Sequence, residues 1–138
     1  AYTDGEYVSF PNAPLPLELT GQAVPFVDAS GGQLPGISKW AASAGGEFRI
    51  PVTFLGTAGE FFTATELSWR DDFSSSATPS RFLNVDSYAL VNLRLGFRAD
   101  NGWSTQLWVR NALDEEYFEL LQAAPGGQGA GHYGAQLG

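Results

Sequence analysis

The sequence predicts an all-β chain folded as an antiparallel up-and-down meander. Three observations predict this fold. Several segments alternate between apolar and polar residues, which is the pattern of strands that have one apolar face and one wet face. Helical periodicity is scarce, and 17 Gly and 8 Pro among 138 residues favour turns and loops. The length is enough for one domain, and no apolar run approaches the ~20 residues that a membrane-spanning helix needs.

The alternating segments locate the elements along the chain. We expect a partial strand over residues 1–10 and then four full strands over residues 37–50, 60–73, 87–99 and 103–118. The connections are alternately long and short, over residues 11–36, 51–59, 74–86, 100–102 and 119–138. A meander gives this alternation when the loops at one end of the sheet are long and the turns at the other end are short. Outer-membrane barrels have that asymmetry, and an ordinary soluble sheet with uneven loops is the alternative.

The composition excludes several classes of protein. The net charge is −8 with only seven Lys and Arg, so a nucleic-acid-binding surface is not expected. The absence of Cys excludes disulfides and zinc–thiolate sites, and it fits an exported protein. Because the chain also lacks Met, we expect that Ala1 follows a cleavage or that the chain is a piece of a longer protein.

The parity of the alternation predicts how the last two strands pair. Pairing Ala99 with Trp103 keeps their apolar sets on one face and leaves a three-residue turn that ends on Gly102, which suits a left-handed conformation. One face then pairs Phe97 with Thr105, Leu95 with Leu107 and Leu93 with Val109. The other face pairs Arg98 with Ser104, Arg94 with Trp108 and Asn92 with Arg110, and Arg94 lies over the Trp108 ring as a cation–π contact.

The same rule predicts one apolar face and one charged face for the whole sheet. The apolar face takes the odd positions of residues 60–73, 87–99 and 103–118, and the even positions of residues 37–50. Four strands are too few to cover that face with a second sheet or to close a barrel of eight, so lipid or further protein must cover it. Aromatic residues gather near both ends of the strands, as in the interfacial girdles of membrane barrels.

Residues 88–119, YALVNLRLGFRADNGWSTQLWVRNALDEEYFE, resemble the closing region of TonB-dependent outer-membrane receptors. In that family a strand with an Asn-Leu-Arg-Leu-Gly-aromatic pattern precedes a tight turn, and the next strand ends in Asn-Leu-Phe-Asp, then two residues and Tyr. Residues 92–97 fit the first pattern. Asn111, Asp114 and Tyr117 fit the second, with Ala112 and Leu113 replacing the usual Leu-Phe pair. YTDGEY (2–7) and LPGISKWAASAGGEFRIP (34–51) look like two earlier strands of the same barrel.

The resemblance implies that residues 1–138 are a C-terminal segment of a transmembrane β-barrel of about 22 strands, without the plug domain and the last strand. The parent would be a transport receptor in the outer membrane of a Gram-negative bacterium. It would take up a scarce nutrient, such as a ferric siderophore, with energy supplied through TonB. Its partners would be outer-membrane lipid, the rest of the barrel, the plug, TonB and the nutrient. The resemblance implies no covalent chemistry, so neither an enzyme nor a cofactor is expected. A self-contained soluble secreted β-sheet module for ligand binding or interaction is the alternative.

The candidate site residues follow from these expectations. The resemblance implies that Asn111, Asp114 and Tyr117 are structural and hold a strand end at the outer rim. Catalysis by the acids at 114–116 is not expected, because neighbours on a strand point to opposite faces. Residues 11–36, 74–86 and 119–138 are the candidate ligand loops, with His132 and Tyr133 in the last; a lone His supports no metal site. The residues expected to face the lumen and the plug are Glu47, Arg49, Glu66, Arg70, Asn92, Arg94 and Arg110.

Overall fold

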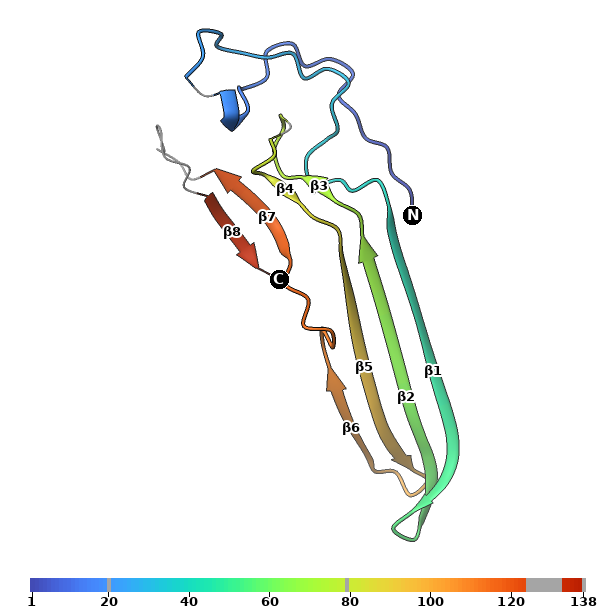
Figure 1. Ribbon diagram of the computed structural model, residues 1–138. Coiled ribbons are helices and arrows are strands. Elements are labelled where there is room, and N and C mark those ends of the chain that lie inside the picture. Colours follow the sequence, from blue (N-terminus) through green and yellow to red (C-terminus); the bar gives the residue numbers. More distant parts are fainter. Residues whose placement is uncertain (20, 79, 124–132, 138) are drawn as a thin grey trace. The chain divides into compact units, whose positions relative to one another are not determined.

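The computed structural model describes residues 1–19, 21–78, 80–123 and 133–137 (Figure 1). The described residues form β-strands and one short 3₁₀ helix, so the all-β prediction is confirmed. None of the helices in this described part is long and apolar enough to cross a membrane. The elements are η1 (Leu17–Leu19), β1 (Ala41–Phe54), β2 (Thr57–Arg70), β3 (Phe73–Ser74), β4 (Asn84–Val85), β5 (Tyr88–Ala99), β6 (Ser104–Val109), β7 (Phe118–Ala123) and β8 (Tyr133–Leu137).

The chain divides into two units. The sheet unit comprises Ala42–Trp69 and Ala89–Glu115 and holds most of a four-stranded sheet in the order β1-β2-β5-β6. The loop unit comprises Ala1–Ala41, Arg70–Tyr88 and Glu116–Gly138, and it holds the β3–β4 and β7–β8 pairs. In the sheet, strands that follow one another are neighbours, apart from the short β3–β4 excursion between β2 and β5. This order is the meander that the sequence predicts.

The turn between β1 and β2 is tighter than predicted. The expected connection over residues 51–59 is wrong, because the two strands continue through it and leave only Leu55 and Gly56 between them. Both residues have positive φ, 49° and 78°, as a two-residue hairpin of the I′ type requires. The sequence suggests a strand end at Pro51, which cannot donate a ladder hydrogen bond. However, β1 continues through Pro51 and ends at Phe54.

The β5–β6 hairpin has the predicted register. The strands pair antiparallel from Leu93↔Val109 to Arg98↔Ser104, with Leu95 opposite Leu107 and Phe97 opposite Thr105. The amide of Ala99 donates to the carbonyl of Trp103 at 2.9 Å, and Gly102 closes the turn with φ 100°. The three-residue turn is therefore confirmed. The ladder ends at Val109, so the predicted strand over 103–118 is too long and the predicted Asn92–Arg110 pair is wrong.

Two glycines allow aromatic rings to lie close against the sheet. A Cβ on Gly96 would lie 2.3 Å from the Thr105 carbonyl oxygen and 2.8 Å from Cζ of Phe62. A Cβ on Gly59 would lie 2.4 Å from the Arg98 carbonyl oxygen and 2.7 Å from Cζ of Phe97. Both rings are only 5 % exposed. The parity of the strands places the Phe62 ring on the charged face and the Phe97 ring on the apolar face, so each face has one ring seated over a glycine.

The loop unit has its own small core. Phe73 and Val85 pair across β3 and β4 and are almost completely buried, with Leu83 and Ala13 also buried. The predicted partial strand over residues 1–10 is wrong. Within the described residues this segment forms no continuous strand and makes only the isolated bridges Tyr2↔Trp40 and Glu6↔Gln33. Separate backbone hydrogen bonds to residues 29–41 hold it in place.

Candidate functional site

The apolar face of the sheet unit is assembled from the predicted positions. A groove of about 420 Å³ is lined by Phe54 of β1, Phe61 of β2, Leu95 of β5 and Leu107 of β6, among others. Even positions of β1 thus share a face with odd positions of β2, β5 and β6, as the alternation predicts. The rings of Phe54 and Phe97 are 5.6 Å apart on this face.

This apolar face is open in the chain. Leu95 is 42 % exposed and Leu107 60 % exposed, although both lie in the middle of a hairpin ladder. Soluble proteins rarely leave a contiguous apolar surface of this kind in contact with water. Other large side chains exposed on the same face are Phe48, Ile50, Phe54, Leu67, Trp69, Leu93, Trp103 and Val109.

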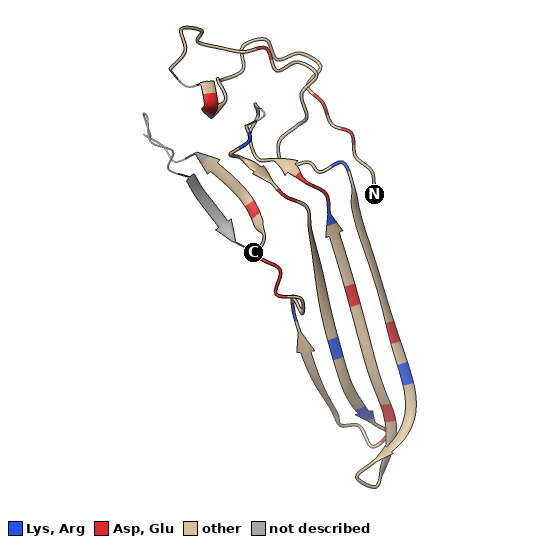
Figure 2. Cartoon of the chain, viewed as in Figure 1, with Lys and Arg blue, Asp and Glu red and all other residues tan. Residues whose placement is uncertain are grey.

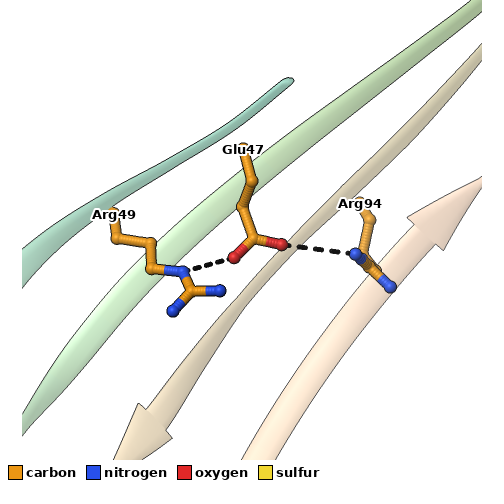
Figure 3. A network of polar contacts seen from close by, with 3 residues as sticks. All are labelled: Glu47, Arg49 and Arg94. Carbon is orange, nitrogen blue, oxygen red and sulfur yellow. Dashed lines mark hydrogen bonds and ion pairs between the residues drawn. The ribbon is translucent and has the colours of Figure 1, made fainter. Parts of the chain in front are cut away.

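The opposite face carries the charges, which Figure 2 shows on β1, β2 and β5. Glu47 lies between two arginines: its Oε1 binds Nε of Arg49, and its Oε2 lies 3.4 Å from Nη2 of Arg94 (Figure 3). Because β2 lies between β1 and β5, the Glu47–Arg94 pair spans β2. The Arg side chains are about half exposed, so solvent screens each pair and it stabilises the sheet only weakly.

A polar groove of about 280 Å³ lies on this charged face. The structure brings four of the predicted lumen residues together around it: Glu66, Asn92, Arg94 and Arg110. Trp108 also lines the groove and is 59 % exposed. The predicted cation–π contact of Arg94 with Trp108 is wrong. Arg94 turns to Glu47, and the guanidinium of Arg110 lies 5.0 Å from the centre of the Trp108 ring instead.

Arg70, the remaining predicted lumen residue, belongs to the loop unit. Its Nε donates to Oγ of Ser38 at 3.0 Å, and its Nη2 donates to the carbonyl of Gly36. The guanidinium lies 4.1 Å from the centre of the Phe73 ring. Arg70 therefore ties the end of the long first loop to the end of β2.

The family-motif residues lie just beyond β6. Asn111 has φ 49°. Its side chain makes two hydrogen bonds to the backbone of Glu115: Nδ2 donates to the Glu115 carbonyl at 2.9 Å, and Oδ1 accepts from the Glu115 amide at 3.0 Å. The Asn111 amide donates to Oδ1 of Asn92 at 3.1 Å. Asp114 also has positive φ, 54°, and its amide donates to the Asn111 carbonyl. The two left-handed residues and the Asn111 bridge end β6 and form a compact turn.

Tyr117, the last motif residue, lies in the loop unit. Its ring stacks on that of Tyr88 at the start of β5, with 4.4 Å between centroids and an interplanar angle of 25°. This stack joins two segments of the loop unit that are far apart in the sequence.

The loop unit holds a second polar groove, of about 440 Å³, at the β3–β4 pair. Its lining is Ser74, Ser80, Arg81, Asn84 and Asp86. Residues 74–86 are one of the candidate ligand loops, but the sequence does not single out these five within it. The only signal is the polar run SSSATPSRFLNVD (74–86), which gives no indication of which side chains converge.

Glu18 of η1 holds one wall of this groove. Its Oε1 accepts from the backbone amide of Arg81 at 2.7 Å. Hydrogen bonds from its own backbone amide first, and then from the Arg81 amide and the Ser80 hydroxyl, lower the pKa of the Glu18 carboxyl. The long first loop is thus bonded directly to the second one.

The last candidate loop is described only in part. His132 lies outside the described residues, and Tyr133 begins β8, opposite Ala123. In the described ranges there is no group of three or more His, Cys, Asp or Glu that could hold a metal ion.

Comparison with known proteins gives one match. The family model described as TonB dependent receptor-like, beta-barrel matches residues 1–112, most of the chain. No curated protein and no solved structure matches the chain significantly.

Proposed function

The chain belongs to the TonB-dependent receptor-like β-barrel family, and we propose that it forms part of the barrel wall of an active-transport receptor. Proteins of this family are transport receptors of the outer membrane of Gram-negative bacteria. In this proposal, residues 1–138 are a C-terminal segment of a longer barrel whose plug domain lies elsewhere in the parent protein. The chain is a wall and a set of loops, and it performs no covalent chemistry.

The observation that carries the proposal is the two-faced sheet of β1-β2-β5-β6. One face exposes large apolar side chains, and the other carries the Glu47 network and the polar groove. A membrane barrel needs this sorting, with an apolar outside and a polar inside. In the described sheet β1 and β6 pair on one side only. Because unpaired backbone groups are costly in lipid, further strands of the parent are expected to pair with both edges.

The charged face is then the lumen wall, where the plug docks. Glu66, Asn92, Arg94 and Arg110 offer both donors and acceptors to a polar plug surface, and Trp108 offers an exposed ring beside them. TonB would act on the plug rather than on this chain. A scarce nutrient, for which a ferric siderophore is the first example that the family suggests, would be captured by the loops.

The turn that ends β6 is proposed to hold that strand end at the outer rim. Asn111 and Asp114 bend the chain there through their left-handed backbone. Tyr117 is proposed to serve the same rim through its stack on Tyr88.

Two measurements test the proposal. In cells, the full-length protein should fractionate with the outer membrane, and uptake of its nutrient should stop when TonB is removed, while passive porin uptake continues. In vitro, residues 1–138 should aggregate in buffer and be recovered by detergent. A monodisperse, cooperatively melting monomer without detergent would support a soluble secreted β-sheet module and refute the membrane wall.

A further inference from the structure

We propose that the apolar groove of the sheet unit seats one acyl chain of a phosphatidylethanolamine molecule from the surrounding bilayer. The groove has a volume of about 420 Å³ and is lined by residues of all four strands, among them Phe54, Phe61, Leu95 and Leu107. Small-molecule sites have volumes of about 300–1,000 Å³. This site rests on the proposed function, in which the apolar face meets lipid, and it adds one lipid at one place on that face.

Three aromatic rings in a row border the groove at the end of the sheet where the β1–β2 and β5–β6 turns lie (Figure 1). The ring centroids of Phe54 and Phe97, which both line the groove, are 5.6 Å apart. Those of Phe97 and Trp103 are 5.3 Å apart. Phe97 is only 5 % exposed and lies over Gly59, so the middle ring of the row is held in place. The groove therefore has a fixed wall at the turns.

Two polar groups lie on the apolar face beside this row of rings. Trp103 and Thr105 have the parity of that face, and Thr105 lines the groove opposite Phe97. In the described part of the chain, neither the indole N–H of Trp103 nor the hydroxyl of Thr105 has a hydrogen-bond partner. Polar groups without partners are costly in lipid. A phospholipid supplies acceptors here, because its ester carbonyls and phosphate lie where a chain seated in the groove begins.

The charge at this end of the sheet favours a zwitterionic headgroup. Of the turn residues 55–56 and 100–102, only Asp100 is charged; it is exposed and in no ion pair with a described residue. Its amide donates to the carbonyl of Ala58 at 3.0 Å, which ties the two turns together. A carboxylate at this position attracts the ammonium group of ethanolamine and repels an anionic headgroup such as that of phosphatidylglycerol.

Hydrophobic burial by itself gives this groove no preference for any lipid, because lipid tails are as apolar as the side chains that line it. The preference comes from the fit of one chain against the ring wall and from the polar groups at its end. The short turns of a membrane barrel lie on the periplasmic side. The groove therefore opens to the phospholipids of that leaflet.

The test uses the full-length protein that carries this chain, reconstituted in vesicles of phosphatidylethanolamine and phosphatidylglycerol. A trace of phosphatidylethanolamine with a diazirine midway along one acyl chain is photo-crosslinked, and mass spectrometry identifies the attached residues. Crosslinks should fall on Val52, Leu95 and Leu107 about fivefold more often than on the rest of the apolar face, as one or two hydrogen bonds to the lipid predict. The same label on phosphatidylglycerol should give about threefold fewer, as an exposed charge contact predicts.

Leu95→Trp fills the groove, and Leu67→Trp is its matched control. Both leucines are 42 % exposed on the apolar face, but Leu67 lies outside the groove. Leu95→Trp should reduce crosslinking of Val52 and Leu107 about fivefold, to the level of the surrounding face. Leu67→Trp should leave it unchanged.

Three conservative variants test the polar groups without filling the groove. Trp103→Phe removes the N–H and keeps an aromatic ring, and Thr105→Val removes the hydroxyl and keeps the branched shape. Each should reduce crosslinking in the groove about threefold, as the loss of one hydrogen bond predicts. Asp100→Asn should keep the crosslinks and remove the preference over phosphatidylglycerol. These small changes keep the site testable if Leu95→Trp does not fold.

Crosslinks that concentrate in the groove, are lost in Leu95→Trp and are kept in Leu67→Trp support the site. Crosslinks spread evenly over the apolar face, or unchanged by Leu95→Trp and Thr105→Val, overturn the site and leave the membrane wall in place. Equal crosslinking by labelled phosphatidylglycerol overturns phosphatidylethanolamine as the occupant. An apolar face without any lipid crosslinks in the reconstituted protein would refute the membrane wall itself.

Discussion

Gly96→Ala should destabilise the parent barrel severely for a change of one methyl group. The new Cβ would lie 2.3 Å from the Thr105 carbonyl oxygen, 2.8 Å from Cζ of Phe62 and 3.0 Å from Cα of Gln106. Two of these three atoms belong to the backbone of β6, which cannot rotate away as a side chain can. Overpacking typically costs ~1–3 kcal/mol, and because a strand must move here we expect the upper end, about 3 kcal/mol.

Gly46→Ala is the matched control. It makes the same change within β1, where a Cβ meets no atom within 4 Å. There the loss of unfolded-state entropy should stabilise the barrel by about 0.4–1 kcal/mol. Gly96→Ala should therefore lower the free energy of unfolding and Gly46→Ala should raise it, so that the two variants differ by about 3–4 kcal/mol. Urea titration of the reconstituted protein, followed by Trp fluorescence, measures both free energies of unfolding.

A second variant tests which neighbouring atom causes the loss of stability in Gly96→Ala. If the Phe62 ring were the obstacle, adding Phe62→Leu to Gly96→Ala would restore most of the stability, and the double-mutant cycle would show strong coupling. We expect little recovery, because the Thr105 oxygen remains at 2.3 Å. Equal stabilities for Gly96→Ala and Gly46→Ala, within about 0.5 kcal/mol, would refute the close approach of the strands at Gly96.

Three other changes test separate parts of the molecule. Leu95→Arg should destabilise the membrane-folded protein by ~2–4 kcal/mol through its place on the lipid face, whereas Arg94→Leu should cost under ~1 kcal/mol because it breaks only a half-exposed ion pair. Asn111→Ala should cost about 2 kcal/mol, from two lost hydrogen bonds and a left-handed backbone, and Asn111→Gly should cost less. The Ser30 hydroxyl and amide lower the pKa of Asp28 below its ordinary 3.8, so this contact should be present above that pH and be lost as the pH falls through the lower folded value.

Each of these changes has a readout that can contradict it. Equal tolerance of Leu95→Arg and Arg94→Leu in chemical unfolding would reverse the assignment of the two faces. If Asn111→Gly destabilised the protein as much as Asn111→Ala, the left-handed backbone at this position would contribute nothing to the cost of Asn111→Ala. For Asp28, the hydrogen-exchange protection of the Ser30 amide should fall in acid, and Asp28→Asn should remove that pH dependence.

The register of the β5–β6 hairpin could be derived from the sequence because two constraints act together. The alternation fixes which residues share a face, and Gly102 supplies the left-handed residue that a three-residue turn needs. Together they leave one short turn. The apolar face follows from the same parity, since each strand has only two faces to choose between.

The parts that could not be derived depend on unusual backbone conformations. Leu55 adopts a left-handed φ, which a leucine rarely does, so nothing at this position of the sequence indicates a turn. Gly56 alone is a weak indication of the two-residue turn. Asn111 ends β6 by the same means, although the alternation continues past it. The ion-pair partner of Arg94 could not be predicted from the sequence either. Glu47 is 47 residues away in sequence and contacts it across an intervening strand.

The two glycines under aromatic rings exclude an error that alternation alone would permit. A slip of one residue between neighbouring strands would turn apolar side chains inward and is excluded by polarity. A slip of two residues keeps every side chain on its proper face and would pass that test. Such a slip would move Phe62 off Gly96 and Phe97 off Gly59, and it would bring each ring against a position that bears a Cβ. The polarity pattern therefore disfavours odd shifts between any two neighbouring strands, and the glycine–phenylalanine contacts disfavour even shifts between β2 and β5.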